Sequence, residues 1–253
     1  MANNNHSEME IQRKLEHLLK NQAVTVHDNL LSEALSYAEA MAAVENTIAV
    51  VSDLSRGKSY IRAGKFAKMI GITGYEQENS IWETKILKQM PEEELGEKIK
   101  AELRFYHFLR HLPKSQRGSY YLMSKLRFIG TNGTVTDVLH RMYYMYDNES
   151  ETVRIAVCLY GPCPKEFNSR SIAVNSITGI VEELTSSDDK RILSARERQV
   201  LSLIDCGMKS SDISERLNIS IHTVSRHRQE ILSKLKVKNS IEACRLAKSM
   251  ELI

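Results

Sequence analysis

The C-terminal stretch, residues 193–248, constrains the fold of this chain more than any other, because apolar residues recur in it at helical spacing between short polar breaks. Ile213 and Leu217 are four residues apart, so both lie on one face of a short helix. A break of three residues follows, and its last residue, Ser220, is a favourable N-cap for another helix. The sequence therefore predicts a short helix, a tight turn and a second helix.

The second helix has one apolar face and a polar, basic remainder. Val224, Ile231 and Leu235 keep the helical repeat, which leaves polar side chains on the other faces. A helix of this kind has the right width for the major groove of DNA, and the whole arrangement is a helix-turn-helix plan. The outer polar residues are His222, Ser225, Arg226, Gln229, Ser233 and Lys236.

Two further helices flank this pair. Ser194 with Glu197 three residues later makes a capping box, and Gly207 is a natural residue to end the helix that begins there. Asn239 and Glu242 repeat the capping pattern and open a last helix. Four helices in about sixty residues can share one small core.

The segment 193–253 resembles the LuxR-type DNA-binding domain in the order and spacing of these residues. In that family the recognition helix usually reads Thr-Val-Lys-x-His. Thr223, Val224 and His227 match this pattern, whereas Ser225 stands in place of the usual Lys. The resemblance implies a domain that pairs as a two-fold dimer through its last helix and reads an inverted repeat.

The same resemblance assigns base-edge contacts to Ser225, Arg226 and Gln229. Arg226 suits a guanine and Gln229 an adenine by donor and acceptor geometry, and the alternative for each is a solvated surface side chain. Glu230 stands where Asn is common, and residues 209–212 differ from the family's usual Ser-Asn-Lys-Glu, so the half-site sequence stays open. The other residues that we assign to DNA are Thr223, His227, Arg228, Lys234, Lys209 and Ser210, and those assigned to the dimer contact are Ile241, Cys244, Arg245 and Lys248.

Basic residues are concentrated in this segment, although the formal net charge of the chain is only +3. Residues 193–253 hold eleven Lys or Arg and seven Asp or Glu, and residues 219–238 hold five and one. The positive excess therefore lies where phosphates would lie. Many helical surfaces are equally basic without binding nucleic acid, so the charge supports the motif without proving it.

Length and composition bound the class of protein. At 253 residues the chain is long enough for two domains. No apolar run approaches the roughly 20 residues that span a bilayer, and the first residues lack the features of a secretion signal. The four cysteines are too few and too scattered for a disulfide framework, and Cys206 and Cys244 are expected in the core. We therefore expect a cytoplasmic protein with no membrane contact.

In the rest of the chain, the spacing of the apolar residues changes from helical to strand-like and back. Residues 1–45 predict a helical segment, either a cap on the next domain or a dimer contact. A strand is expected at 153–159, where strict alternation gives one apolar face. The other elements expected are strands at 48–51, 59–62, 120–129, 135–146, 171–174 and 179–184, short helical pieces at 66–70 and 81–90, and a longer helix at 91–112.

Two strands, several helices and three strands in this order resemble the layout of the PAS sensor fold, which some LuxR-type regulators join to such a DNA-binding end. The resemblance implies a sensing or dimerisation domain. Its aromatic residues could line a cavity for a small ligand or simply fill the core. The fold class expected is α+β, with a PAS-like antiparallel sheet and helices at 46–185, a linker at 186–192 and an all-α, four-helix helix-turn-helix domain at 193–253.

No catalytic or cofactor motif is visible in the sequence. His107 and His111 stand four apart on one helix and, with His140, could ligate haem, but hydrogen-bonded or surface histidines are the commoner case. Cys158 and Cys163 have no matching second pair for a zinc site. No nucleophile–base or carboxylate pair stands out. We predict no enzyme, no metal and no evident cofactor beyond an unknown small molecule.

Two functions remain. The first is a sequence-specific transcription factor that binds double-stranded DNA as a homodimer, with the PAS-like domain sensing or dimerising. The second is a protein-interaction module whose helical end, which also resembles region four of sigma factors, docks RNA polymerase or another protein. Salt would separate them, because a dimer that contacts on the order of 6–10 phosphates loses affinity steeply as salt rises.

Overall fold

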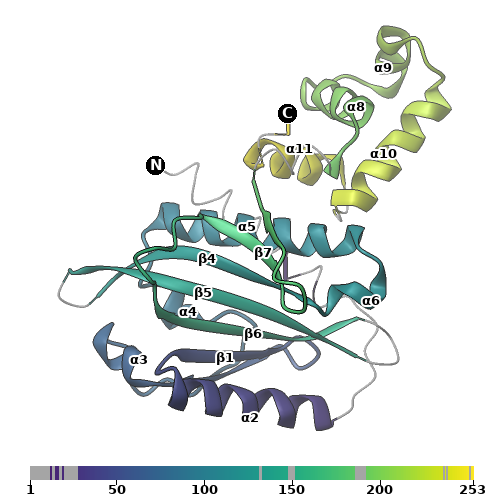
Figure 1. The fold of residues 1–253 in the computed structure, drawn as a ribbon. Helices are drawn as coiled ribbons and strands as arrows, with labels where there is room; N and C mark the ends of the chain where they lie inside the picture. Colours follow the sequence, from purple (N-terminus) through teal and green to yellow (C-terminus); the bar gives the residue numbers. More distant parts are fainter. Residues whose placement is uncertain are drawn as a thin grey trace. The chain divides into compact units, whose positions relative to one another are not determined.

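The computed structural model describes residues 12, 15, 16, 19, 28–130, 133–147, 152–185, 192–235, 237, 239–250 and 252–253. They fall into two compact units, of which one contains Glu16–Leu184 and the other contains Thr185–Ile253. Within the described residues, the first unit is an antiparallel sheet with helices and the second consists of helices (Figure 1). The expected α+β class is therefore confirmed.

The larger unit is organised by one antiparallel sheet, in which the described residues form eight strands in the order β3-β2-β1-β6-β5-β4-β7-β8. β1 and β6, which are far apart in the sequence, are neighbours in the sheet, where Ile48 lies opposite Tyr160. The strands are β1 (Ile48–Asp53), β2 (Lys58–Ala63), β3 (Gln77–Glu78), β4 (Tyr120–Ile129), β5 (Val135–Tyr146), β6 (Val153–Pro162), β7 (Ser171–Asn175) and β8 (Val181–Glu183).

The predicted strands are confirmed, with two differences. The two-residue strand β3 was not expected, because so short a segment is a strand only by virtue of its pairing with β2. The expectation of a single apolar face on β6 is wrong, since every residue from Val153 to Gly161 is buried. Its polar side chains face a second covered layer and not solvent.

One face of the sheet is covered by helix α2 (Asp28–Val44) (Figure 1). Leu31, Ala34 and Ala38 of the helix pack against Val157 of β6 and its buried neighbours on the same face. The alanines are small, so the helix backbone can approach the strands closely, and the buried side chains fill the space between. This apolar layer fixes α2 to the sheet.

The opposite face carries the side chains that alternate with this layer, and helix α5 (Glu92–His111) packs there against β4 and β5. Three glutamates occupy the first turn of α5, where the helix dipole favours negative charge. The predicted helix at 91–112 is thus confirmed. The shorter helices are α3 (Lys65–Met69), α4 (Thr84–Leu87) and α6 (Lys114–Arg117), the last of which was not expected.

The smaller unit contains helices α8 (Ala195–Asp205), α9 (Ser210–Leu217), α10 (Ile221–Leu235) and α11 (Ser240–Ser249). These are the four helices that the capping residues and the spacing of Ile213 and Leu217 predicted. Their shared core contains Val200, Ile213, Val224 and Ala247, each with no exposed surface. The expectation for Cys206 is wrong: it is exposed just beyond the end of α8, whereas Cys244 is buried.

Some expectations fall outside the described residues. These are most of the helical stripe in residues 1–27, the tip of the hairpin at residues 131–132, and residues 186–191 of the predicted linker at 186–192. None of the helices that the structure describes is long and apolar enough to cross a membrane.

Candidate nucleic-acid interface

Helices α9 and α10 form a helix-turn-helix. Helix α9 ends at Asn218, which has the left-handed backbone conformation (φ 52°) that lets the chain turn away from the helix. The hydroxyl Oγ of Ser220 then accepts a 3.0 Å hydrogen bond from the backbone N–H of Thr223, which caps the start of α10. The cap and the turn set the angle at which α10 leaves α9.

Three apolar residues turn one face of α10 inward. Val224, Ile231 and Leu235 are each at most 1% exposed and lie in the core of the smaller unit. Because their positions fix the rotation of the helix about its axis, the opposite face must point outward.

Ser225, Arg226 and Gln229 occupy this outward face, and all three are exposed. They are spaced at i, i+1 and i+4, so their side chains lie side by side on the helix surface. The Arg226 side chain is 74% exposed. The structure therefore brings together the three residues that were expected to read base edges.

Arg226 is paired along the helix with Glu230. Its Nε donates a hydrogen bond of 2.9 Å to Oε1 of Glu230, one turn further on. The other carboxylate oxygen of Glu230 lies 3.7 Å from Nδ1 of His227. The sequence marked Glu230 only as a departure from the usual Asn, although the spacing of four residues was sufficient to predict its pairing with Arg226.

Arg228 lies on a different side of α10 and links three helices. Its guanidinium donates to the hydroxyl of Ser240 at the start of α11 over 3.0 Å and to that of Ser210 at the start of α9 over 3.4 Å. Two of the residues expected to contact DNA, Arg228 and Ser210, thus contact one another inside the domain. These bonds hold the ends of α9 and α11 against α10.

Lys234 makes a salt bridge to α8. Its Nζ lies 2.7 and 2.8 Å from the two carboxylate oxygens of Glu197, whose side chain is only 2% exposed. Glu197 also accepts a hydrogen bond from the backbone N–H of Ser194 and so completes the capping box. Burial would raise the pKa of Glu197, but the bonds from Lys234 and Ser194 outweigh it and hold the pKa below its ordinary value.

The remaining predicted residues are divided between the surface and the interior. Lys209 is exposed at the start of α9, where its backbone N–H donates to Asp212. Thr223 is half-buried, with its hydroxyl 2.9 Å from that of Ser220, and His227 is half-buried as well. Only Lys209 among these has a side chain directed to solvent.

Helix α11 presents part of the expected dimer contact. Ile241 is 67% exposed, and Arg245 is exposed as well. Lys248 pairs with Asp205 of α8 over 2.8 Å. Cys244 faces the core of its own domain, with Sγ 3.8 Å from the carbonyl oxygen of Leu201, so it does not share the outer surface with Ile241.

Among the described residues, two groups of side chains have the composition and proximity of metal ligands. The group in the smaller unit is Glu197, His227 and Glu230, but Glu197 is already paired with Lys234 and Glu230 with Arg226. The group in the larger unit is buried between the sheet and α5.

Comparison with known proteins assigns the family of the smaller unit. Residues 191–247 match the sequence model of a family described as bacterial regulatory proteins, luxR family. The match spans α8, α9, α10 and most of α11, so the C-terminal end of the chain is a LuxR-type helix-turn-helix domain. Proteins of the LuxR family are DNA-binding transcription regulators and not enzymes.

Individual relatives cover only part of the chain. The oxygen regulatory protein NreC of Staphylococcus epidermidis is 39% identical over 72 residues, which are 28% of this chain and 33% of that protein. The response regulator UvrY of Escherichia coli is 42% identical over 55 residues, 22% of this chain and 25% of that protein. The chain thus spans about a third or less of the length of these curated relatives.

Solved structures also show similarity over a longer part of the chain. A structure of the Vibrio cholerae VqmA dimer in the absence of target DNA, described as a LuxR-type receptor, is 14% identical. The similarity covers 83% of this chain and 85% of that one, with a TM-score of 0.32.

Proposed function

We propose that the protein is a sequence-specific transcription regulator that places α10 in the major groove of double-stranded DNA. The observation that carries this proposal is the outward face of α10, where Ser225, Arg226 and Gln229 lie opposite the buried Val224 and Ile231 in a LuxR-type domain. A helix with this division of faces can dock on DNA while its other side stays in the core.

Each exposed residue has a role that suits its chemistry. Arg226 can donate two hydrogen bonds to the O6 and N7 of a guanine, and Gln229 can pair with an adenine. The hydroxyl of Ser225 can accept from or donate to either base. Lys209, at the start of α9, is free to contact phosphate, as the first helix of this motif crosses the DNA backbone.

Arg228 and Lys234 have a different role in this proposal. Both already make ion pairs or hydrogen bonds inside the domain, with Ser240 and Glu197 respectively. They position α10 relative to α8 and α11, and in that way they support its fit to the groove. Thr223 and His227 likewise act through the cap and packing of α10.

The domain reads an inverted repeat as a homodimer in this proposal. Ile241 and Arg245 form an exposed surface on α11, and Lys248 lies one turn beyond Cys244 on the same helix. An isologous contact between two such helices relates the two α10 helices by a two-fold axis, so that they face successive turns of the major groove.

The larger unit is, in this proposal, a PAS-like sensor and dimerisation domain, and the protein acts in the cytoplasm, where operator DNA is found. Support for this comes from its antiparallel sheet, with α2 on one face and α5 on the other. Polar side chains, among them Lys98 and Glu102, are buried in this unit and are the groups that a small polar ligand would meet.

The decisive experiment is selection of bound sequences from a random duplex library with the full chain at two salt concentrations, followed by sequencing. An enriched inverted repeat whose affinity falls steeply with salt would support the proposal. The matched control is Arg226→Ala, which should enrich sequences that are degenerate at one position of each half-site. A protein that enriches nothing at either salt would contradict DNA binding by the full chain.

A protein partner is the alternative, and one observation favours it. Glu230 places a carboxylate beside the outward face of α10, where it would repel phosphate but could pair with a basic partner. In that case α10 docks RNA polymerase or another protein. Binding of purified polymerase to the chain in the absence of DNA, with loss in Glu230→Lys, would support this alternative.

A further inference from the structure

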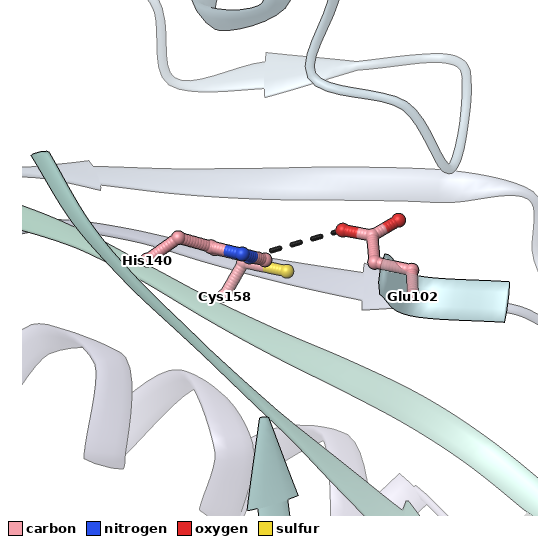
Figure 2. Close-up of side chains that lie close together, drawn as sticks. All are labelled: Glu102, His140 and Cys158. Atoms are coloured by element: carbon pink, nitrogen blue, oxygen red, sulfur yellow. Dashed lines mark ion pairs between the residues drawn. The ribbon is translucent and has the colours of Figure 1, made fainter. Parts of the chain in front are cut away.

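Three side chains meet in the interior of the larger unit, between the sheet and α5. Glu102 comes from α5, His140 from β5 and Cys158 from β6, and Figure 2 shows them directed toward one another. All three are buried, and His140 has no exposed surface at all. One ligand atom of each, a carboxylate oxygen, a ring nitrogen and the sulfur, lies within 4.8 Å of the other two.

The register of the sheet brings the histidine and the cysteine together. His140 is paired with Tyr160, and Met142 is paired with Cys158, so His140 and Cys158 are diagonal neighbours on the same face. Glu102 then reaches them from the helix above, with its Oε1 3.8 Å from Nε2 of His140. The three residues are distant in sequence, which is why no sequence motif indicated them.

His140 lacks the partners that a buried histidine normally has. Neither of its ring nitrogens has a hydrogen-bond partner, and the ring is stacked on Tyr160 at 4.8 Å between centroids. A ring nitrogen without a hydrogen bond has its lone pair to offer, and an imidazole binds metals through that lone pair.

The charges around the three residues do not balance. Lys98 Nζ lies 2.5 Å from Oε1 of Glu102 and 3.5 Å from Oε1 of Glu83, and all three side chains are buried. Two carboxylates and one ammonium leave one excess negative charge in the interior. A divalent cation bound with the Cys158 thiolate would bring the sum to zero.

We propose that Glu102, His140 and Cys158 bind one divalent transition-metal ion of the zinc class. Zinc takes oxygen, nitrogen and sulfur ligands at about 2.0–2.3 Å, which places tetrahedral ligand atoms roughly 3.3–3.8 Å apart. The Glu102–His140 separation is already at the upper end of this range. The thiolate excludes Mg²⁺ and Ca²⁺, which prefer oxygen ligands.

The ion would link α5 to the centre of the sheet and leave one coordination position open. Oε1 of Glu102 faces both His140 and Lys98, so Glu102 would bind the ion through Oε1 and Lys98 would move to Oε2, the second carboxylate oxygen. The lone pair of His140 would gain the partner that it lacks. Metal binding of this kind adds directly to the stability of the unit that forms the site. The inference does not depend on the proposed DNA binding.

The test uses the full chain, stripped with a chelator and titrated with Co²⁺ as a spectroscopic substitute for Zn²⁺. We expect a thiolate-to-cobalt charge-transfer band that saturates at one ion per chain and disappears when Zn²⁺ is added. Cys158→Ser should abolish the band, because the serine hydroxyl does not form it. Cys163→Ser and Cys206→Ser, at the two cysteines that are not buried, are the matched controls and should keep it.

A second variant separates loss of a ligand from loss of the fold. His140→Gln should weaken Zn²⁺ binding by more than about 100-fold, since loss of even an outer partner of a ligand costs 10–100-fold. Fluorescence of Trp82, in the same unit, checks that each variant is folded. A wild-type chain without the band, or a band that survives in Cys158→Ser, would overturn the proposal. So would an organic molecule that co-purifies with the chain and is retained when metal is removed.

Discussion

The guanidinium Nε of Arg226 lies 2.9 Å from Oε1 of Glu230, one turn further along α10. The pair is exposed and contributes only about 0.2–0.5 kcal/mol to the stability of the helix. Its main consequence is orientation. With Nε engaged by Glu230, the two terminal nitrogens of Arg226 are the donors that a bidentate contact to a guanine would use.

Arg226→Ala should weaken binding to the selected operator by about 1–3 kcal/mol, because the bidentate contact to one base is lost. Binding to random duplex should change much less. Titration of the wild type and the variant on both duplexes at the same salt concentration measures the difference. Equal losses on operator and random DNA would show that Arg226 contacts only phosphate.

Glu230→Gln should raise affinity for all duplexes by roughly two- to fivefold, since a carboxylate near the phosphates is removed. The ratio of operator affinity to random affinity should fall at the same time, because Arg226 loses its fixed direction. Competition assays with both duplexes give this ratio. An unchanged ratio would mean that the pair has no part in base recognition.

Lys234→Ala should destabilise the smaller unit by about 1–2 kcal/mol, or roughly 5–15 °C in melting temperature, because the buried Glu197 carboxylate loses its charged partner. Helical circular dichroism on heating follows both units, since both contain helices, whereas the single tryptophan, Trp82, reports only the larger one. A loss of helical signal that precedes the change in Trp82 fluorescence therefore reports the smaller unit. The double variant Lys234→Met, Glu197→Gln is the control and should recover part of the loss. If Lys234→Ala instead left stability unchanged and weakened every duplex alike, its role would be a phosphate contact.

Acid should destabilise the smaller unit through Glu197. Its folded pKa is lower than its unfolded pKa of about 4.3, so the unfolded state binds more protons and stability rises with pH. The contribution is complete above the unfolded pKa and is lost as pH falls through the folded value. Thermal melts between about pH 7 and pH 3 should show a steeper fall for the wild type than for Glu197→Gln. Parallel curves would assign the acid sensitivity to other groups.

The protein should bind a duplex with two half-sites more tightly than a duplex with one. Ile241→Asp should remove this difference in affinity, because a charge on this surface opposes the pairing of two α11 helices. Binding curves on the two duplexes measure this difference. Ile177→Asp is a matched control, as Ile177 is a similarly exposed isoleucine in the larger unit. A difference that persists in Ile241→Asp would place the dimer contact elsewhere.

The helices of the smaller unit could be predicted closely because their signals are local. Ser194, Ser220 and Asn239 each accept a hydrogen bond from a backbone N–H three residues later, and a reader of the sequence sees both partners together. The same holds for the pairing of Arg226 with Glu230. Interactions of this range need no knowledge of tertiary structure.

The salt bridge between Lys234 and Glu197 could not be predicted in this way. It joins α10 to α8, and it depends on how the two helices pack and not on spacing along the chain. The sequence therefore suggested phosphate as the partner of Lys234, which is the usual reading of a lysine near the end of a recognition helix.

The interior of the larger unit was beyond sequence reasoning for a similar reason. Alternation along β6 made Arg154 and Cys158 look like one solvent-facing row, but both are buried. Only the tertiary structure shows that α5 covers this row and brings Lys98 and Glu102 with it. Polar residues in a strand therefore indicate a solvent-exposed face only when no other element packs on that face.

The adjacency of β1 and β6 has a consequence for the order in which this protein can fold as it is made. β1 cannot gain its central neighbour until the ribosome has released Tyr160, the partner of Ile48. Until then the early hairpin of β1 and β2 has a bare hydrogen-bonding edge, which invites pairing with other chains. Contacts so distant along the chain also close slowly. Chaperone demand during synthesis should therefore concentrate on the larger unit, while the four C-terminal helices, with their local contacts, form rapidly once they emerge.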